Sequence, residues 1–453
     1  MNTKYFHASV LILIVLAGVA VRIGLSYSSL CGRGPIEDPD GYLALAESLV
    51  SGRGFSWEGR PTAYRPPLYP LALAPIVALG IDRAGSGIMA LHAALGAGTI
   101  ALIYHASIRF GLSIRRALCA SAIVAFDPVL IAQSRAVMTE TLAAFLVALA
   151  LFLVGGRDRR DKSDQDKYVD QKIVGSGSRR LWGAFWGGIA LGLGTMCRPS
   201  LAAVVPIAAV LGLITNGSRL RDRAAWGLAL CAGMIVPLVP WGVRNLKAIG
   251  SPVLLTTHGG YTLSLANNPY YYKDVLNQKT EAVWGGSGQM RYWAWVRETT
   301  AGLGEVEGDR LLRDEAIRFA RSRPFDFARA SVARLGRFWG VAPSSLVYSR
   351  GRRLATAGWT IPLFAALAWG LFRPESRRRP LILAVAVLIA LSLIHAVYWT
   401  DLRMRAPAVP AIAVIAACAS TRRSSSSVLI ERGLQDQSEK ISEDHAVQTR
   451  GIR

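Results

Sequence analysis

Long apolar runs alternate with short charged connections along most of the chain. A helix needs about 20 predominantly apolar residues to cross a bilayer. The runs that reach or approach this length are residues 7–27, 86–107, 116–132, 136–155, 181–198, 200–215, 224–242, 355–372, 381–400 and 404–420. The pattern predicts an all-α polytopic membrane protein with ten or eleven transmembrane helices.

Arginine and lysine are concentrated in five connections between these runs. The five are Arg109 to Arg116, the insert 156–180, Arg219 to Arg223, Arg373 to Arg379, and Arg422 with Arg423. Connections rich in Lys and Arg normally stay in the cytoplasm. We therefore expect all five on the cytoplasmic side together with both termini, and residues 28–65 and 243–354 on the outer side. Long outer loops escape this charge bias, so the arginines in 243–354 do not contradict the assignment.

Residues 66–82, with the sequence PPLYPLALAPIVALGID, do not fit a full span. The segment is apolar but short and rich in proline, and a crossing here would move Arg109 to Arg116 to the outer side. We expect a re-entrant or interfacial helix. Ten crossings follow from this assignment, whereas a crossing at 66–82 would give eleven.

These assignments divide the chain into six parts. The parts are a first span (1–27), an outer loop with an interfacial or re-entrant helix (28–85), six further spans with the cytoplasmic insert 156–180 (86–242), an outer region (243–354), three C-terminal spans (355–420) and a cytoplasmic tail (421–453). The first apolar run is long and lacks a clear small-residue cleavage site, so it is expected to remain as a span rather than to be removed as a signal peptide.

Composition narrows the class of protein further. Hydrophobic residues make up 52 % and charged residues 18 % of the chain, against about 25 % charged in soluble proteins, which excludes a soluble enzyme and a disordered chain. The net charge of +22 arises from residues that flank apolar runs, so we expect no nucleic-acid partner. Five scattered cysteines without a CxxC pair exclude a disulfide framework and a zinc knuckle. Buried thiols are expected instead.

The outer loop contains an acidic cluster directly before a helix-like run. Glu37, Asp38 and Asp40 precede Tyr42–Val50. An N-cap would need only one of these carboxylates. A carboxylate that is partly desolvated at a membrane surface has a raised pKa and becomes a better general base, so the cluster indicates either a cap or a catalytic acid.

Further ionisable and polar groups fall on the same side in this topology. They are Arg65, Glu140, Arg198, Arg244, Asn245, His258, Asp401, Arg403 and Arg405. Arg65 suits a phosphate at headgroup depth, although simple snorkelling would also place it there. Glu140 also suits a helix N-terminus through the helix dipole. Carboxylates and arginines from separate segments therefore converge on one face, which favours an anionic lipid headgroup and a proton-transfer reaction.

Several short motifs together resemble the GT-C superfamily of membrane glycosyltransferases. They are Asp38 four residues before Tyr42 with small residues following, GRGF at 52–55, TAYRPPLYP at 62–70, SRAVMTE at 134–140, CRP at 197–199, PWGVRN at 240–245, RPFDFARASVARLGRFW at 323–339 and DLRMRAP at 401–407. The similarity is greatest to the protein O-mannosyltransferase-like branch, which includes the lipid A aminoarabinose transferase and bacterial galacturonosyltransferases. It implies a GT-C-type bundle with a seven-span core.

The resemblance implies an inverting transferase that moves a sugar from a polyprenyl-phosphate donor to an acceptor at the outer face of the plasma (inner) membrane. Its roles would be distributed as follows: Asp38 as catalytic base, with Asp40 as cap or orienting neighbour and Glu140 as a further acid; Arg65, Arg198, Arg244 and Arg405 on the donor phosphate; and Tyr42, Tyr69, Asn245 and His258 as other substrate contacts. The acceptor, whether lipid, glycan or protein, stays open.

One departure from the family concerns metal binding. Relatives often have a second acid just before the paired prolines, where this chain has Tyr64 and Arg65. We therefore assign no metal ligand, although His258 leaves a divalent metal possible, and expect no other cofactor.

Two other classes of function remain as alternatives. One is a transporter or flippase of an anionic lipid or solute, and the other is a polymer-binding scaffold. Transporters usually show repeats and polar groups near the midplane. The polar groups here gather at one face instead, which favours the transferase.

Overall fold

The computed structural model describes residues 3–32, 36–80, 84–155, 175–215, 219–277, 284, 286–373 and 379–419. Most of the insert 156–180 and the whole tail 421–453 lie outside the described residues. Within the described part, helices coincide with every predicted apolar run, and the extended structure is a two-residue antiparallel ribbon of β1 (Ser56–Trp57) and β2 (Arg60–Pro61). The all-α polytopic prediction is confirmed.

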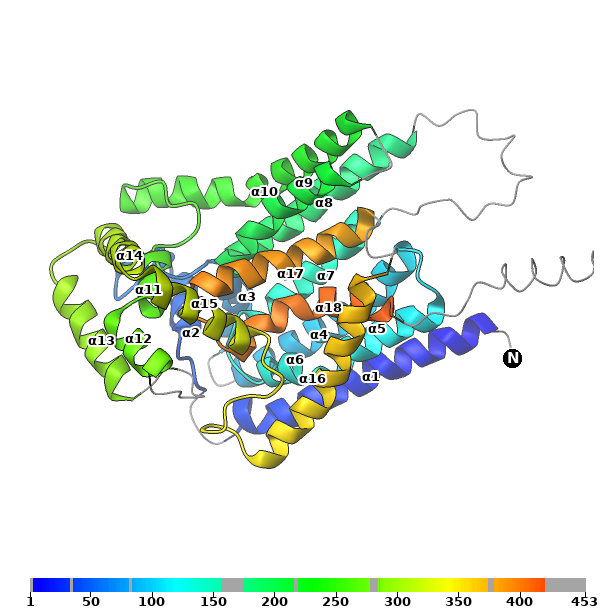
Figure 1. The fold of residues 1–453 in the computed structure, drawn as a ribbon, viewed down its shortest axis with the longest axis horizontal. Helices are drawn as coiled ribbons and strands as arrows, with labels where there is room; N and C mark the ends of the chain where they lie inside the picture. The colour runs from blue at the N-terminus through cyan, green and yellow to red at the C-terminus, as the bar shows by residue number, and fades with distance from the viewer. Residues whose placement is uncertain are drawn as a thin grey trace, which may run out of the picture. The chain divides into compact units, whose positions relative to one another are not determined.

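The bundle is built from long helices and from helices in two pieces (Figure 1). Its elements are α1 (Thr3–Leu30), α4 (Ala84–Arg109), α5 (Ile114–Phe126) with α6 (Pro128–Gln133), α7 (Glu140–Val154), α8 (Gly175–Cys197), the 3₁₀ segment η3 (Pro199–Ala203) with α9 (Val204–Ile214), α10 (Leu220–Ile249), α16 (Arg350–Leu371), α17 (Arg379–Val397), and the 3₁₀ segment η6 (Leu402–Ala408) with α18 (Val409–Ala417). By length and composition, α1, α4, α10 and α16 are each long and apolar enough to cross a membrane.

Helices α1 and α4 pack antiparallel through glycines. A Cβ atom on Gly96 would lie 2.9 Å from the Cδ atom of Arg22, and one on Gly85 would lie 1.7 Å from the carbonyl oxygen of Leu30. The end of α1 therefore meets the start of α4. We call the end of the bundle at Leu30 and Gly85 the loop end, and the other the insert end.

The chain between α1 and α4 consequently leaves and re-enters the bundle at the same end. It contains α2 (Tyr42–Val50), the ribbon, and α3 (Leu68–Ala78). Helix α3 has 11 residues, or roughly 16 Å at 1.5 Å per residue, against about 30 Å of hydrocarbon. This geometry favours ten crossings over eleven.

A second group of helices follows α10. It comprises α11 (Gly259–Ala266), α12 (Pro269–Tyr272), the π-helical turn η4 (Lys273–Asn277), α13 (Ser287–Thr299), α14 (Glu305–Ser322) and α15 (Pro324–Phe338). We call it the α11–α15 region. Its core is aromatic, with Tyr271, Tyr272, Trp284 and Tyr292 all buried. Tyrosine and tryptophan pack well and keep a polar atom for hydrogen bonding, so this small region is held together by rings.

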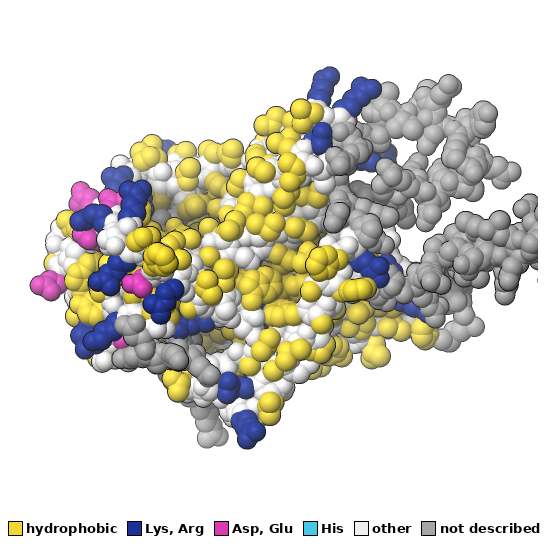
Figure 2. All heavy atoms as spheres, viewed as in Figure 1, with side chains coloured by type: hydrophobic (Ala, Val, Ile, Leu, Met, Phe, Trp, Pro, Cys, Tyr) yellow, Lys and Arg dark blue, Asp and Glu magenta, His cyan; other side chains and the backbone are white. Residues whose placement is uncertain are grey.

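Surface polarity separates the two ends of the bundle. Figure 2 shows hydrophobic side chains over the middle, both acidic and basic ones over the α11–α15 region, and basic ones at the insert end. This is the charge distribution that the positive-inside rule describes. Among the thiols, Cys197 and Cys418 are buried as expected, but Cys119 is exposed. The expectation of burial was wrong there because an apolar helix surface facing lipid needs no protein cover.

Candidate functional site

Asp38 holds the start of α2. Its Oδ1 accepts a hydrogen bond from the Tyr42 N–H and its Oδ2 one from the Leu43 N–H, each at 2.8 Å. The chain reaches this geometry through Gly41, whose φ of 73° suits glycine. Burial raises the pKa of Asp38 above its ordinary value, although backbone hydrogen bonds oppose the shift and the nearby Asp40 charge adds to it. The sequence indicated that one carboxylate of the acidic cluster would cap α2, and in the structure this carboxylate is Asp38.

Asp40 instead pairs with Arg65. The Arg65 Nη2 lies 2.8 Å from the Asp40 Oδ1, and the Arg65 Nε donates to the Asp40 carbonyl at 3.1 Å. The remaining fork nitrogen, Nη1, lies 3.3 Å from the His258 Nε2. Arginine only donates, so Nε2 accepts and the imidazole proton sits on Nδ1. The backbone and side chain of one aspartate thus fix the arginine that faces the histidine.

Aromatic rings surround this ion pair. The Arg65 guanidinium lies 5.2 Å from the centre of the Tyr64 ring and 5.9 Å from that of Tyr42. Tyr64 meets the His258 ring edge-on at 4.4 Å, and Tyr261 stacks on the same imidazole at 5.0 Å. Burial, and then the charge of Arg65, lower the pKa of His258 well below its ordinary value. His258 is therefore a neutral hydrogen-bonding group.

The donors here do not fit a divalent metal. In the described part of the chain, His, Cys, Asp and Glu side chains form no group of three or more that could hold one. The imidazole of His258 faces the cationic Arg65, and Tyr64 stands beside it in place of an acid. A metal ion would meet a positive charge where it needs a ligand, so no metal-dependent step is assigned.

A second ionic cluster surrounds Glu140 at the start of α7. Glu140 is 1 % exposed, and its Oε1 lies 2.8 Å from the Arg198 Nη1 and 3.8 Å from the Arg403 Nε. Arg403 also pairs with Asp401 at 3.4 Å, and Arg198 donates to the Thr139 Oγ1 at 3.2 Å. Among the described residues, the second oxygen of Glu140 has no hydrogen-bond partner. The cluster balances two carboxylates against two arginines and keeps one free acceptor.

Tyr42 lies between the two clusters. Burial raises the pKa of Tyr42, and the charges of Arg65, Asp40, Glu140 and Arg198 all act on its hydroxyl. Its ring packs edge-on against Tyr69 at 5.3 Å. Both clusters therefore belong to one site around a shared ring.

Tyr69 faces the interior rather than the open side of this site. Its hydroxyl lies 3.0 Å from the His92 Nε2, and the His92 Nδ1 lies 3.0 Å from the Ser134 carbonyl. Because the carbonyl must accept, the neutral imidazole carries its proton on Nδ1 and accepts from Tyr69. Tyr69 thus fixes α3 against α4, and the structure gives it no place in substrate contact.

Two further residues singled out in the sequence, Arg244 and Asn245, bind backbone carbonyls instead of facing the clusters. Arg244 donates to the carbonyls of Phe55 and Thr62, the latter at 2.7 Å. Asn245 is buried and donates to the Val253 carbonyl at 2.7 Å. Each of these contacts locks the first loop or the chain after α10. The two residues therefore shape the site without lining it.

Arg405 likewise points away. It is buried and donates to the carbonyls of Gly340, at 2.7 Å, and Phe338. Arg403, which the sequence placed on the same face but which was not assigned to the donor phosphate, lies beside Glu140 instead. In a 3₁₀ helix of three residues per turn, side chains two residues apart point about 120° away from each other. The signal that could have found Arg403 is the 3₁₀ turn, which the apolar pattern does not reveal.

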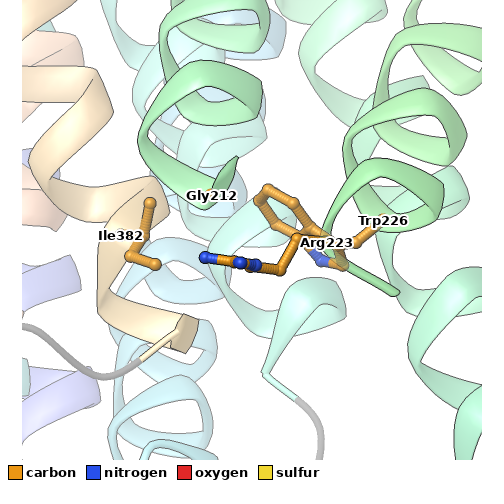
Figure 3. A pocket seen from close by; sticks show the side chains of 4 residues that line it. All are labelled: Gly212, Arg223, Trp226 and Ile382. Carbon is orange, nitrogen blue, oxygen red and sulfur yellow. The ribbon is translucent and has the colours of Figure 1, made fainter. Parts of the chain in front are cut away.

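The structure also has a small hollow at the insert end (Figure 3). Gly212, Arg223, Trp226 and Ile382 line it. Arg223 donates to the carbonyls of Leu213 and Thr215 and so caps α9. At 1.5 Å per residue, α10 separates Arg223 from Arg244 by about 30 Å. The four described residues that line the hollow include no carboxylate.

Comparison with known proteins identifies the fold. Residues 80–246 match the family model of dolichyl-phosphate-mannose-protein mannosyltransferases. No curated protein matches the chain. Among solved structures, the archaeal oligosaccharyltransferase AglB from Archaeoglobus fulgidus, in complex with an inhibitory peptide and a dolichol-phosphate, is 16 % identical with a TM-score of 0.53, over 97 % of this chain and 52 % of its own.

A second neighbour is ArnT from Cupriavidus metallidurans in the apo state. It is 15 % identical with a TM-score of 0.52, over 92 % of this chain and 60 % of its own. The chain thus spans about half to three fifths of these proteins. Both neighbours are GT-C glycosyltransferases, and the GT-C fold that the sequence motifs indicated is confirmed.

Proposed function

We propose that this protein is an inverting glycosyltransferase that moves a sugar from a polyprenyl-phosphate donor to an acceptor at the outer face of the plasma membrane. The observation that carries the proposal is the meeting of three carboxylates, Asp38, Asp40 and Glu140, with arginines around Tyr42 at the loop end of a GT-C bundle. The family match and the dolichol-phosphate in the AglB complex support this donor class.

The donor phosphate would bind the arginines of both clusters. Arg65, Arg198 and Arg403 each already pair with a carboxylate, which fixes the orientation of each fork. A guanidinium has five N–H donors and can bind two phosphate oxygens at once. The N–H groups that are not bonded to a carboxylate would bind the phosphate, while the carboxylates hold each arginine in place. Arg403 therefore replaces Arg405 in the predicted set, and Arg244 supports the loop.

Asp38 would take the proton from the acceptor. Each carboxylate oxygen has two lone pairs, and the backbone N–H groups of Tyr42 and Leu43 use one on each. The free lone pairs can accept the acceptor proton, and the burial that raises the pKa of Asp38 makes it a stronger base.

The reaction then proceeds by a single displacement. The acceptor oxygen or nitrogen bonds to the anomeric carbon as the carbon–oxygen bond to the phosphate breaks on the opposite face, which inverts configuration. The phosphate leaves with the electron pair as a weak base, so no general acid is required. Positioning and electrostatic stabilisation by the arginines would supply most of the rate.

The transporter alternative finds less support. A transport path needs polar groups that line it within the membrane. Arg22 of α1 is buried and polar, but it donates to the carbonyls of Gly18, Val124 and Ala125. These bonds tie α1 to α5 and leave no open polar path at that position.

The test is sugar transfer by purified protein in detergent. Polyprenyl-phosphate donors with different sugars are incubated with a panel of lipid, glycan and peptide acceptors, and products are identified by mass spectrometry. We expect a glycosylated acceptor with inverted anomeric configuration from wild-type protein and about 10²–10⁴-fold less from Asp38→Asn. Movement of the lipid across vesicles without transfer would instead establish the flippase.

A further inference from the structure

Glu305, the first residue of α14, reaches out of the α11–α15 region to the loop before α3. Its Oε2 accepts from the Thr62 hydroxyl at 2.6 Å and its Oε1 from the Ala63 N–H at 2.9 Å. The Thr257 hydroxyl also donates to Oε1. One carboxylate therefore joins three segments that are distant in the sequence.

These contacts lie beside the Arg65–His258 pair. Ala63 is two residues before Arg65, and Thr257 directly precedes His258. The Thr257 N–H also donates to the Ala63 carbonyl at 3.0 Å. The backbone on both sides of the pair is thus held together by Glu305, and the Arg65 Nη1 and His258 Nε2 meet at 3.3 Å.

The role of Glu305 is more than that of an ordinary acid in the first turn of a helix. The neighbouring Glu307 already bonds to the Gly304 N–H at 3.4 Å in the manner of a capping box, and Glu307 is exposed. Glu305 bonds to two loop segments outside its own helix, at Thr62–Ala63 and at Thr257, and Arg244 donates to the Thr62 carbonyl. The helix has its cap without Glu305, so the three bonds serve the loop.

We propose that Glu305 is a positioning residue for donor binding: it locks the α11–α15 region onto residues 62–65, so that Arg65 is presented to the donor phosphate. The inference rests on the proposed function for its substrate. Glu305 does not contact Asp38, whose carboxylate is held by α2 alone. Loss of Glu305 therefore weakens donor binding and leaves the base in place.

The experiment compares Glu305→Gln with the matched control Glu307→Gln, which makes the same substitution in the first turn of the same helix. Glutamine keeps the size of the side chain but replaces an acceptor oxygen with a donor, which opposes the N–H and O–H groups that Glu305 binds. We expect the donor KM of Glu305→Gln to rise about tenfold or more with kcat nearly unchanged. Glu307→Gln should match wild type in both.

A second measurement does not depend on turnover. Diethyl pyrocarbonate modifies neutral imidazole, and peptide mass spectrometry reports the rate at His258 alone. In wild-type protein the reaction should be slow, because Nε2 accepts from Arg65 and Nδ1 is buried. Glu305→Gln should speed it several-fold, and Glu307→Gln should not.

The outcomes separate the two proposals. If wild-type protein transfers no sugar, the proposed function is wrong. The rate at which diethyl pyrocarbonate modifies His258 then tests the positioning role of Glu305 independently. Unchanged donor KM and unchanged His258 rate in Glu305→Gln overturn the inference while leaving transfer intact. If Glu305→Gln is not recovered from membranes, Thr257→Val removes one of the three bonds and should show the same changes at smaller size; a wild-type response from that variant also overturns the inference.

Discussion

At the scale of single residues, two neighbouring aspartates are distinguished by their partners. Asp38 binds backbone N–H groups and forms no ion pair with another described residue, whereas Asp40 forms an ion pair with Arg65. A base needs a free lone pair for the incoming proton, and Asp40 uses one of its oxygens to hold Arg65. The different partners support the proposed division of roles, with proton transfer by Asp38 and orientation of Arg65 by Asp40.

The first prediction compares Asp38→Asn with Asp40→Asn at matched membrane abundance. Asparagine also caps helices, so Asp38→Asn should fold, but it cannot take the acceptor proton and should lower the transfer rate about 10²–10⁴-fold. Asp40→Asn loosens Arg65 and should act mainly on donor KM. A nearly normal rate for Asp38→Asn with a dead Asp40→Asn would exchange the two roles, and activity in both would direct attention to Glu140.

The second prediction concerns pH. Asp38 must be ionised to act as a base, so activity falls as pH drops through its pKa, which burial raises above the ordinary value. The Asp40 charge adds to that rise, so Asp40→Asn should move the acid limb of the kcat/KM profile to lower pH. The measurement is kcat/KM against pH for both proteins. An acid limb in the same place, or at higher pH in the variant, would contradict a base that senses Asp40.

How much of the site follows from the sequence is clearest for the arginines. The sequence could predict which arginines lie at the same end of the bundle, because the apolar runs determine which connections share a side of the membrane. The direction of each side chain could not, since it depends on helix rotation and on 3₁₀ turns such as η6, where Arg403 and Arg405 diverge. Glu305 was missed for a related reason: its partners are distant in the sequence, and no local pattern marks them.

At the scale of elements, the break between α5 and α6 explains a charged residue inside the bundle. The predicted single span 116–132 is two helices, because Pro128 has no N–H for the Val124 carbonyl and the Val129 N–H turns to the Asp127 carboxylate. The freed carbonyls of Val124 and Ala125 accept from Arg22 at 2.9 and 2.7 Å. Arg22 thus completes a helix that proline interrupts.

The third prediction follows from that completion. Arg22→Leu leaves two buried carbonyls without a donor, at a cost of about 1–3 kcal/mol each. We expect a clearly lower thermal unfolding temperature in detergent and lower abundance in membranes. Arg115→Leu, at an exposed position at the start of α5, serves as the control and should stay near wild type. Equal stability of both variants would mean that lipid or water replaces the guanidinium.

At the scale of the whole molecule, the order of the helices places the proposed site and the basic connections at opposite ends of the bundle. The proposed active-site residues gather at the loop end, and the described basic connections, Arg109 to Arg116 and Arg219 to Arg223, lie at the insert end. If the positive-inside assignment holds, every catalytic group lies outside the cell. The donor would then have to present its sugar on the outer leaflet.

The fourth prediction tests that orientation in a variant without native cysteines. A cysteine at Ser287, at the start of α13, should react with a membrane-impermeant maleimide in intact cells. A cysteine at Ser178, in the first turn of α8, should react only after the inner face is opened. Both positions are exposed. The reverse labelling would overturn the topology and the location of the site.

The close approach of Leu30 and Gly85 has a consequence for how the segment between them can vary among homologues. Because the chain leaves and returns at one point, everything between these residues is an insertion on a closed scaffold. The entropic cost of a longer insertion grows only with the logarithm of its length, about 0.6 kcal/mol per doubling. The segment is nevertheless bonded to the rest of the protein through His92, Arg244 and Glu305, so a segment transplanted from a homologue would keep its geometry only if these three partners were exchanged with it.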